Sequence, residues 1–204
     1  VAGNTSGNVE YSSDGVTWTQ VASGISGSSN VAGVSRIGST FFAVGGDEIS
    51  RSTDGQSWTV GPLESNTFGR SIAGHASTLV VVGSSTSIST NNGISWTQPE
   101  ALQYTYLNDV IRTATQYVAV GDSGTIFTSA NGVAWTNRSL SEPSNLKAVA
   151  ASPTMTVAVG GDLYSSQAVI YSSPNGIAWT KRPIGVGNEI VDVVWTGSRF
   201  IALC

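Results

Sequence analysis

The sequence predicts an all-β fold in which five similar units of four short antiparallel strands follow one another along 204 residues. The first observation is a motif, Ser/Thr-x-Asp/Asn-Gly-x-x-Trp-Thr, that occurs five times. Its tryptophans lie 40, 38, 39 and 44 residues apart and are Trp18, Trp58, Trp96, Trp135 and Trp179. Such spacings match the four-stranded blades of β-propellers, which repeat about every 40–50 residues. The predicted fold is therefore a five-bladed β-propeller of four-stranded antiparallel blades.

The second observation is that each repeat has the same order of strands and turns. An alternating apolar run is followed by a turn and then by a short strand that is almost entirely apolar. These apolar strands are residues 41–44, 79–82, 117–120, 156–159 and 200–203. Continuous apolar runs of this length are typical of strands buried on both faces. No segment shows a sustained period of 3.6 residues, so no helix is expected.

The two ends of the chain predict how such a ring would close. The chain finishes on a second strand, residues 200–203, and begins just before a third strand, residues 9–11. The 25 residues after Trp179 and the 18 up to Trp18 would make a fifth spacing of 43. We expect one domain, residues 1–204, whose last blade takes strands from both termini and so hides two exposed sheet edges.

The five motif copies are expected to be hairpins between the third and fourth strands. They span residues 12–19, 52–59, 90–97, 129–136 and 173–180. Adjacent Asp-Gly or Asn-Gly predicts a type I′ turn, which needs positive φ at both positions. The Trp three residues later is expected to pack between neighbouring sheets. The alternative, five sugar-stacking platforms, is the weaker reading, because a position tied to a turn is what folding alone demands.

These repeats resemble the Asp-box (BNR-type) and photosystem-assembly-factor-like β-propeller repeats of bacteria. The resemblance is clearest over residues 107–136, which include the run Tyr117-Val118-Ala119-Val120-Gly121-Asp122 and the motif Gly132-Val133-Ala134-Trp135-Thr136. It covers nearly the whole chain and implies a propeller whose boxes are structural and lie away from the ligand face. The chain departs from the usual box, in which one residue separates Asp from Gly, so the turn geometry can differ.

Composition limits the classes of partner and location. Only 11% of residues are charged and the formal net charge is −4, which argues against a nucleic-acid or anionic-membrane partner. A surface of small polar residues favours an extracellular protein or one on a cell or virion surface. The one cysteine, Cys204, cannot form an internal disulfide. No apolar run approaches the ~20 residues of a membrane helix, so no membrane insertion is expected.

The candidate ligand-binding residues lie where the repeats differ. Connections between blades and turns between second and third strands should share one face, opposite the hairpins. That face offers aromatic side chains beside Asn and Asp, which suit sugars or protein surfaces: Asn66, Phe68, Tyr104, Tyr106, Asp122, Asp162 and Tyr164. In the alternative reading the Asp residues form turns and the tyrosines anchor loops. A metal at Asp47, Asp122 and Asp162 is a further alternative, although the chain has no calcium-loop pattern.

No catalytic constellation stands out, so we expect no enzyme, no cofactor and no metal site. The seven arginines share no common position in the repeat, as the carboxylate grip of a sialidase would require. The single histidine, His75, lies in a turn and has no nucleophile motif nearby. The expected function is glycan or protein recognition through the inter-blade loop face. The alternatives are a structural subunit of a filament, capsid or surface layer, and a degenerate sialidase-like glycosidase.

Overall fold

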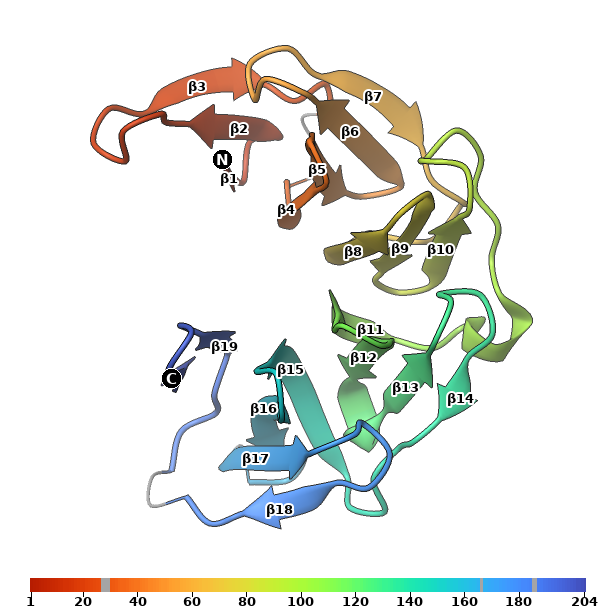
Figure 1. The fold of residues 1–204 in the computed structure, drawn as a ribbon, viewed down its shortest axis with the longest axis vertical. Helices are drawn as coiled ribbons and strands as arrows, with labels where there is room; N and C mark the ends of the chain where they lie inside the picture. Colours follow the sequence, from red (N-terminus) through yellow and green to blue (C-terminus); the bar gives the residue numbers. More distant parts are fainter. Residues whose placement is uncertain (27–29, 166, 185–186) are drawn as a thin grey trace. The chain divides into compact units, whose positions relative to one another are not determined.

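A computed structural model describes residues 1–26, 30–165, 167–184 and 187–204 as an all-β protein (Figure 1). The chain divides into two compact units, Val1–Tyr104 and Thr105–Cys204, which are described separately. No helix among the described residues is long and apolar enough to cross a membrane.

The first unit contains three antiparallel sheets, each built from strands that are consecutive in the chain. The first sheet is β1 (Ala2–Gly3), β2 (Asn8–Tyr11) and β3 (Thr19–Ala22). The second is β4 (Gly33–Ile37), β5 (Thr40–Gly45), β6 (Glu48–Ser52) and β7 (Thr59–Pro62). The third is β8 (Ser71–His75), β9 (Thr78–Val82) and β10 (Thr86–Ser89), followed by the 3-10 helix η1 (Glu100–Leu102).

The second unit contains three more sheets of the same antiparallel kind. One consists of β11 (Leu107–Arg112), β12 (Tyr117–Gly121), β13 (Ile126–Ser129) and β14 (Thr136–Asn137), with the 3-10 helix η2 (Asp122–Gly124) between β12 and β13. The next consists of β15 (Ser144–Ala151), β16 (Thr156–Asp162), β17 (Ala168–Ser173) and β18 (Thr180–Arg182). The last pairs β19 (Asp192–Trp195) with β20 (Phe200–Leu203).

The predicted four strands per repeat are confirmed in three sheets, β4–β7, β11–β14 and β15–β18. In the third repeat the fourth strand is reduced to a single bridge between Ile88 and Thr97. Pro99 follows almost at once, and its missing N–H and fixed φ end the pairing there. The expectation of no helix was wrong for the two short 3-10 segments, which a period of 3.6 residues cannot reveal.

The terminal sheets differ from the prediction. The described N-terminus forms an extra short strand, β1, which pairs Ala2 with Glu10 and Gly3 with Val9 of β2. That is the side of β2 on which residues 200–203 were expected. In the described part of the chain β20 pairs only with β19. The count of five blades and the closure of one blade by both termini are therefore not confirmed.

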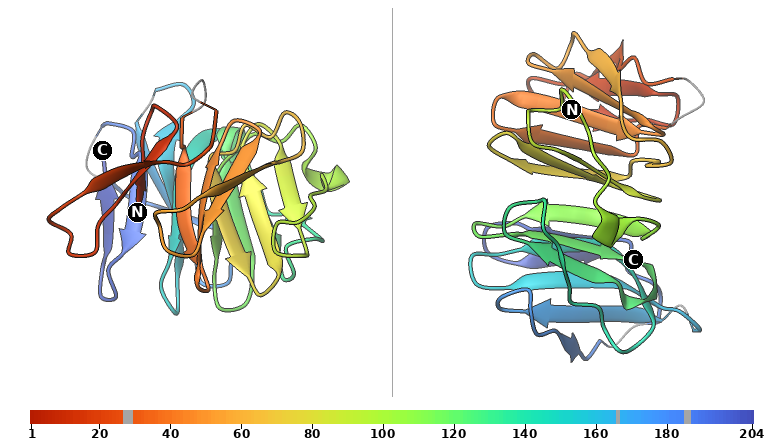
Figure 2. Two further views of the ribbon diagram at one scale, coloured as in Figure 1. Left: turned by 90° about the horizontal axis from the view of Figure 1, so that it is seen from above. Right: turned by 90° about the vertical axis from the view of Figure 1, so that its right-hand side faces the viewer.

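Apolar side chains from adjacent sheets form the core within each unit. In the first unit, one cluster joins β4–β7 to β8–β10 through Phe42, Ile49, Ile72 and Val81. In the second, an equivalent cluster joins β11–β14 to β15–β18 and includes Val118, Ile126, Leu146 and Tyr171. Figure 2 shows the neighbouring sheets of each unit lying face to face. The predicted burial of the apolar second strands is confirmed for β5, β9, β12 and β16, whereas it was wrong for β20, which is mostly exposed in this structure.

In four repeats, a glycine near the end of the second strand allows the chain that enters the sheet to pass close by. A β-carbon at Gly45 would clash with the carbonyl oxygen of Asn30, and one at Gly160 would clash with that of Asn145. Gly83 and Gly121 stand in the same relation to the segments that enter their own sheets. The entering chain and the turn after the second strand therefore share one end of the sheet, as predicted.

Three of the motif tryptophans pack between sheets, as expected. Each lies in, or packs against, a cluster that contains an aliphatic residue of the preceding sheet, three positions before that sheet's box serine. Trp58 packs in a cluster with Val9, Trp96 in a cluster with Ile49, and Trp179 against a cluster that contains Ile126. Trp135 contacts Tyr117 of its own sheet at a ring-centroid distance of 6.2 Å. Trp18, in the first sheet, is 50% exposed.

The repeated hairpin is a wide loop and not the predicted type I′ turn. In the first box the Asp14 carboxylate accepts the backbone N–H groups of Val16 and Thr17, both at 2.8 Å. The Ser12 hydroxyl accepts the N–H of Gly15, also at 2.8 Å. Only the glycine, with φ of 75°, has the left-handed backbone, whereas a type I′ turn needs two such residues. Side-chain oxygens therefore satisfy the N–H groups that a tight hairpin would pair.

The third box begins at residue 89, one residue earlier than the sequence motif predicts. Ser89 and Asn91, rather than Thr90 and Asn92, make the equivalent hydrogen bonds, to the N–H groups of Gly93 and Ser95. Asn92 is an extra residue with φ of 59°, which the other boxes lack. Counted this way, one residue separates Asn91 from its glycine, which is the usual Asp-box spacing.

The boxes make stability sensitive to acid. Backbone N–H groups of Thr17 and Val16 lower the pKa of Asp14 to about 2, and those of Ser57 and Gln56 lower the pKa of Asp54 to about 2. The unfolded value is about 3.9, so this stabilisation is present above about pH 4 and is lost as the pH falls towards 2. The double variant Asp14→Asn/Asp54→Asn keeps both acceptor oxygens but does not titrate.

We therefore expect the urea midpoint of the natural chain to fall more, between about pH 5 and about pH 2.5, than that of this double variant. The other carboxylates titrate in both proteins and serve as the internal control. Equal losses of midpoint would contradict the assignment of these two pKa values.

Candidate functional site

The connection between β7 and β8 is held in an unusual conformation by Asp47. The Asp47 carboxylate accepts the N–H of Asn66 at 3.0 Å and that of Phe68 at 2.9 Å. Asn66 and Phe68 have φ of 64° and 42°, a region that is rare for a bulky side chain. The Phe68 ring is 53% exposed. The predicted site residues Asn66 and Phe68 thus belong to one anchored loop.

Thr67 lies between Asn66 and Phe68 and holds this loop through its buried side chain. It is fully buried, and its hydroxyl lies 2.6 Å from the carbonyl oxygen of Glu64 and 2.6 Å from the Ser87 hydroxyl. The N–H of Gly69 donates to the carbonyl of Gly46 at 2.7 Å. The loop is therefore tied to β10 of the sheet that it enters and to the turn after β5 of the preceding sheet, while Phe68 stays half-exposed.

The two predicted tyrosines of the next connection fall in different units. Tyr104 ends the first unit; it has φ of 61° and is 88% exposed. The buried Leu102 of η1 anchors the segment just before it. Tyr106 belongs to the second unit and is about one-third exposed. The exposed Tyr104 ring is available to a partner, and Tyr104 shares the left-handed backbone of the other two candidates in its unit.

In the second unit, Asp122 lies in a network of polar and charged side chains. Its carboxylate accepts from Asn108 Nδ2 at 2.8 Å and lies 4.0 Å from Lys147 Nζ. Lys147 also lies 3.6 Å from Glu189, so one lysine bridges two carboxylates. Because these groups are partly exposed, the ion pairs contribute little to stability. Asp122 positions the chain at this end of its sheet, and its carboxylate is already engaged.

Asp162 is a turn-forming residue, as the alternative reading held. Its carboxylate accepts the N–H of Tyr164 at 3.0 Å and both the N–H and the hydroxyl of Ser165 at 2.9 Å. The Ser165 N–H is the main cause of its lowered pKa. Tyr164 is left exposed at the tip. Among the described residues, no group of three or more His, Cys, Asp and Glu side chains could hold a metal ion.

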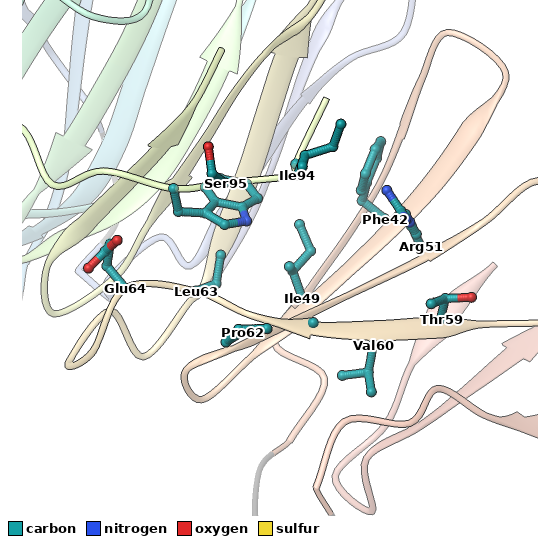
Figure 3. Close-up of a pocket in the computed structure, with 13 residues that line it drawn as sticks. Phe42, Ile49, Arg51, Thr59, Val60, Pro62, Leu63, Glu64, Ile94 and Ser95 are labelled. Carbon is teal, nitrogen blue, oxygen red and sulfur yellow. The ribbon is translucent and has the colours of Figure 1, made fainter. Parts of the chain in front are cut away.

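The structure also contains a pocket that the sequence analysis missed. It lies in the first unit between β6–β7 and the third box, and its volume is about 440 Å³ (Figure 3). Its walls are largely apolar and include Phe42, Ile49, Leu63, Ile94 and Trp96. We name it the Trp96 pocket. In the sequence, the third box differs from the other boxes by one extra residue. Matching the boxes at their Asn-Gly pair hides this difference.

The repeated four-stranded sheets, which pack face to face, define the class: the chain has a β-propeller fold. No protein-family model and no curated protein matches the chain. Solved structures of β-propeller proteins do. "YCF48 bound to D1 peptide" has a TM-score of 0.58 and 16% identity, covering 77% of this chain and 54% of its own.

An ancestral GH74 enzyme has a TM-score of 0.60 and 17% identity, covering 78% of this chain and 26% of its own. The WD40 domain of Neurospora crassa Pan2 has a TM-score of 0.64 and 10% identity, covering 87% and 58%. The chain therefore spans less than two thirds of each of these structures. At such identities the likeness establishes the fold alone, and the resemblance to Asp-box repeats stays a prediction.

Proposed function

We propose that this chain is a non-catalytic recognition propeller that binds a protein partner through the face carrying the connections between sheets. The observation that supports this most is Phe68, whose half-exposed ring is held in a left-handed backbone conformation by Asp47. Such a conformation costs roughly 1–3 kcal/mol and persists only where its surroundings impose it. Aromatic anchors fixed before binding are typical of the energetic centres of protein interfaces.

A protein partner is preferred to a glycan because one similar propeller, YCF48, is described as bound to a peptide. The absence of catalysis and a location outside the cell or on a virion remain predictions from composition and motif. Hydrolysis of a panel of fluorogenic sugars would reveal the glycosidase alternative.

The test of this function is a selection of phage-displayed peptides on the whole chain, with a glycan array in parallel. We expect peptides to be enriched, and we expect Phe68→Ala to weaken their affinity by roughly ten-fold or more, as loss of an aromatic anchor does. Val16→Ala, an exposed change in the first box, is the matched control and should have no effect. No peptide enrichment, or binding only to glycans, would overturn the proposal.

We also propose that β19 and β20 complete a fifth blade with β2 and β3. The lengths of the terminal segments support this, as does the exposure of apolar residues at both ends, including Trp18, Val194 and Ile201. β1 would then give up its place beside β2.

A further inference from the structure

The Trp96 pocket has the size and lining of a ligand site. Its volume of about 440 Å³ lies within the range of about 300–1,000 Å³ for ligand pockets. Figure 3 shows Ile49 and Leu63 on its floor, with Glu64 and Arg51 on opposite sides of these aliphatic residues. Within the described residues neither Glu64 nor Arg51 forms an ion pair. The pocket therefore offers an apolar centre with a free charge of each sign at its ends.

The pocket also contains a buried donor without a partner. Trp96 is only 9% exposed, and its Nε1 has no hydrogen-bond acceptor among the described residues. In three other boxes the same indole N–H donates to the carbonyl of the box glycine, at 2.9–3.2 Å. The third box alone contains the extra residue Asn92, which gives it a second left-handed position before Trp96. Leaving such a group unpaired costs about 1–3 kcal/mol, so it marks a place where an acceptor is missing.

The second unit provides an internal comparison. A hollow of about 390 Å³ lies at the equivalent place, between the segment after β14 and the last box, and is lined by Ile177 and Trp179. There the indole N–H of Trp179 is bonded to Gly176, and Lys181 pairs with Glu142 at 2.7 Å. The indole and the lysine of this hollow are therefore paired, although Arg138 Nε, in its wall, is buried without an acceptor among the described residues. The unpaired indole N–H distinguishes the Trp96 pocket from this hollow.

We propose that the Trp96 pocket binds one bulky apolar side chain of a partner peptide. A peptide fits better than a hydrocarbon ligand because Arg51 and Glu64 place a charge of each sign beside the apolar floor, and a hydrocarbon cannot pair with either charge. Arg51 and Glu64 favour an acidic residue on one side of the apolar residue and a basic one on the other. This inference rests on the proposed function, since both take the partner to be a protein, but it concerns a different surface.

Gly61 allows the pocket to be closed without disturbing the fold. It is the register partner of Ile49, so a side chain there lies on the same face as Ile49, towards the pocket. A β-carbon at Gly61 meets no atom within 4 Å. Gly61→Leu should therefore fill the pocket, whereas Gly61→Ala leaves most of it open and is the matched control.

The probe is N-acetyl-L-phenylalanine methylamide, which carries one apolar ring and two amide carbonyls. Its binding is followed by the ¹⁵N-indole resonances of the tryptophans. We expect the Trp96 resonance to shift and saturate while that of Trp179 stays unmoved. Gly61→Leu should weaken this affinity by roughly ten-fold or more, and Gly61→Ala should change it little.

Two results would overturn the inference: no shift of Trp96 up to the solubility limit of the probe, or an equal shift in Gly61→Leu. Peptides selected on the whole chain separate this failure from failure of the proposed function. If the selected peptides bind Phe68→Ala more weakly but bind Gly61→Leu unchanged, the loop face is their binding site and the pocket is not. If the probe binds but no peptide does, the proposed peptide ligand is wrong.

Discussion

Replacing Trp96 by alanine is expected to lower the free energy of unfolding by about 3–5 kcal/mol. The indole is nine-tenths buried and packs between two sheets in a cluster with Phe42, Ile49 and Val81. Its removal leaves a cavity next to a pocket that already exists, so the sheets gain little by collapsing around it. Because its N–H is unpaired, the loss comes from packing and not from a broken hydrogen bond.

Urea denaturation followed by circular dichroism measures this change without relying on tryptophan fluorescence. Ile94→Ala, at an exposed position in the same box, is the control and should shift stability by no more than about 0.5 kcal/mol. A loss below about 1 kcal/mol for Trp96→Ala would contradict the role of this tryptophan in joining the sheets.

The fold could be predicted closely because the information for it is local and repeated. The apolar second strands recur at one place in each repeat, and so do the box serine and its tryptophan. The structure keeps that order. The type of turn could not be predicted, because Asp-Gly is compatible with a tight hairpin and with a wide loop. What decides between them is whether the Asp14 oxygen bonds the backbone, which depends on three-dimensional placement.

The candidate site was predicted less well, for two physical reasons. Asp162 and Asp47 look alike in sequence, yet one holds only its own turn while the other reaches across to Asn66 and Phe68. Such a contact, 19 to 21 residues away, is not a periodic signal. The Trp96 pocket was missed because it forms between segments of two different sheets, which no pattern within one repeat reveals.

Closure of the fifth blade predicts a new packing partner for Trp18, because the other motif tryptophans pack at a repeated position. Trp58, Trp96 and Trp179 each share a cluster with an aliphatic residue that lies three positions before the box serine of the preceding sheet. If β19 and β20 complete a blade with β2 and β3, the preceding sheet is β15–β18. The residue at that position is Ile170, which is only partly buried. Closure would therefore place Trp18 on Ile170.

We expect Trp18→Ala to lower the free energy of unfolding by about 3 kcal/mol, although a half-exposed ring by itself predicts much less. Because Trp18 and Ile170 are 152 residues apart in the chain, energetic coupling between them has no local origin. A double-mutant cycle of Trp18→Ala with Ile170→Ala should give an interaction energy above about 0.5 kcal/mol, as for residues in contact. The same cycle with Ile126, which is already covered by Trp179, should be additive. Additivity in both cycles would mean that the two terminal half-sheets do not form one blade.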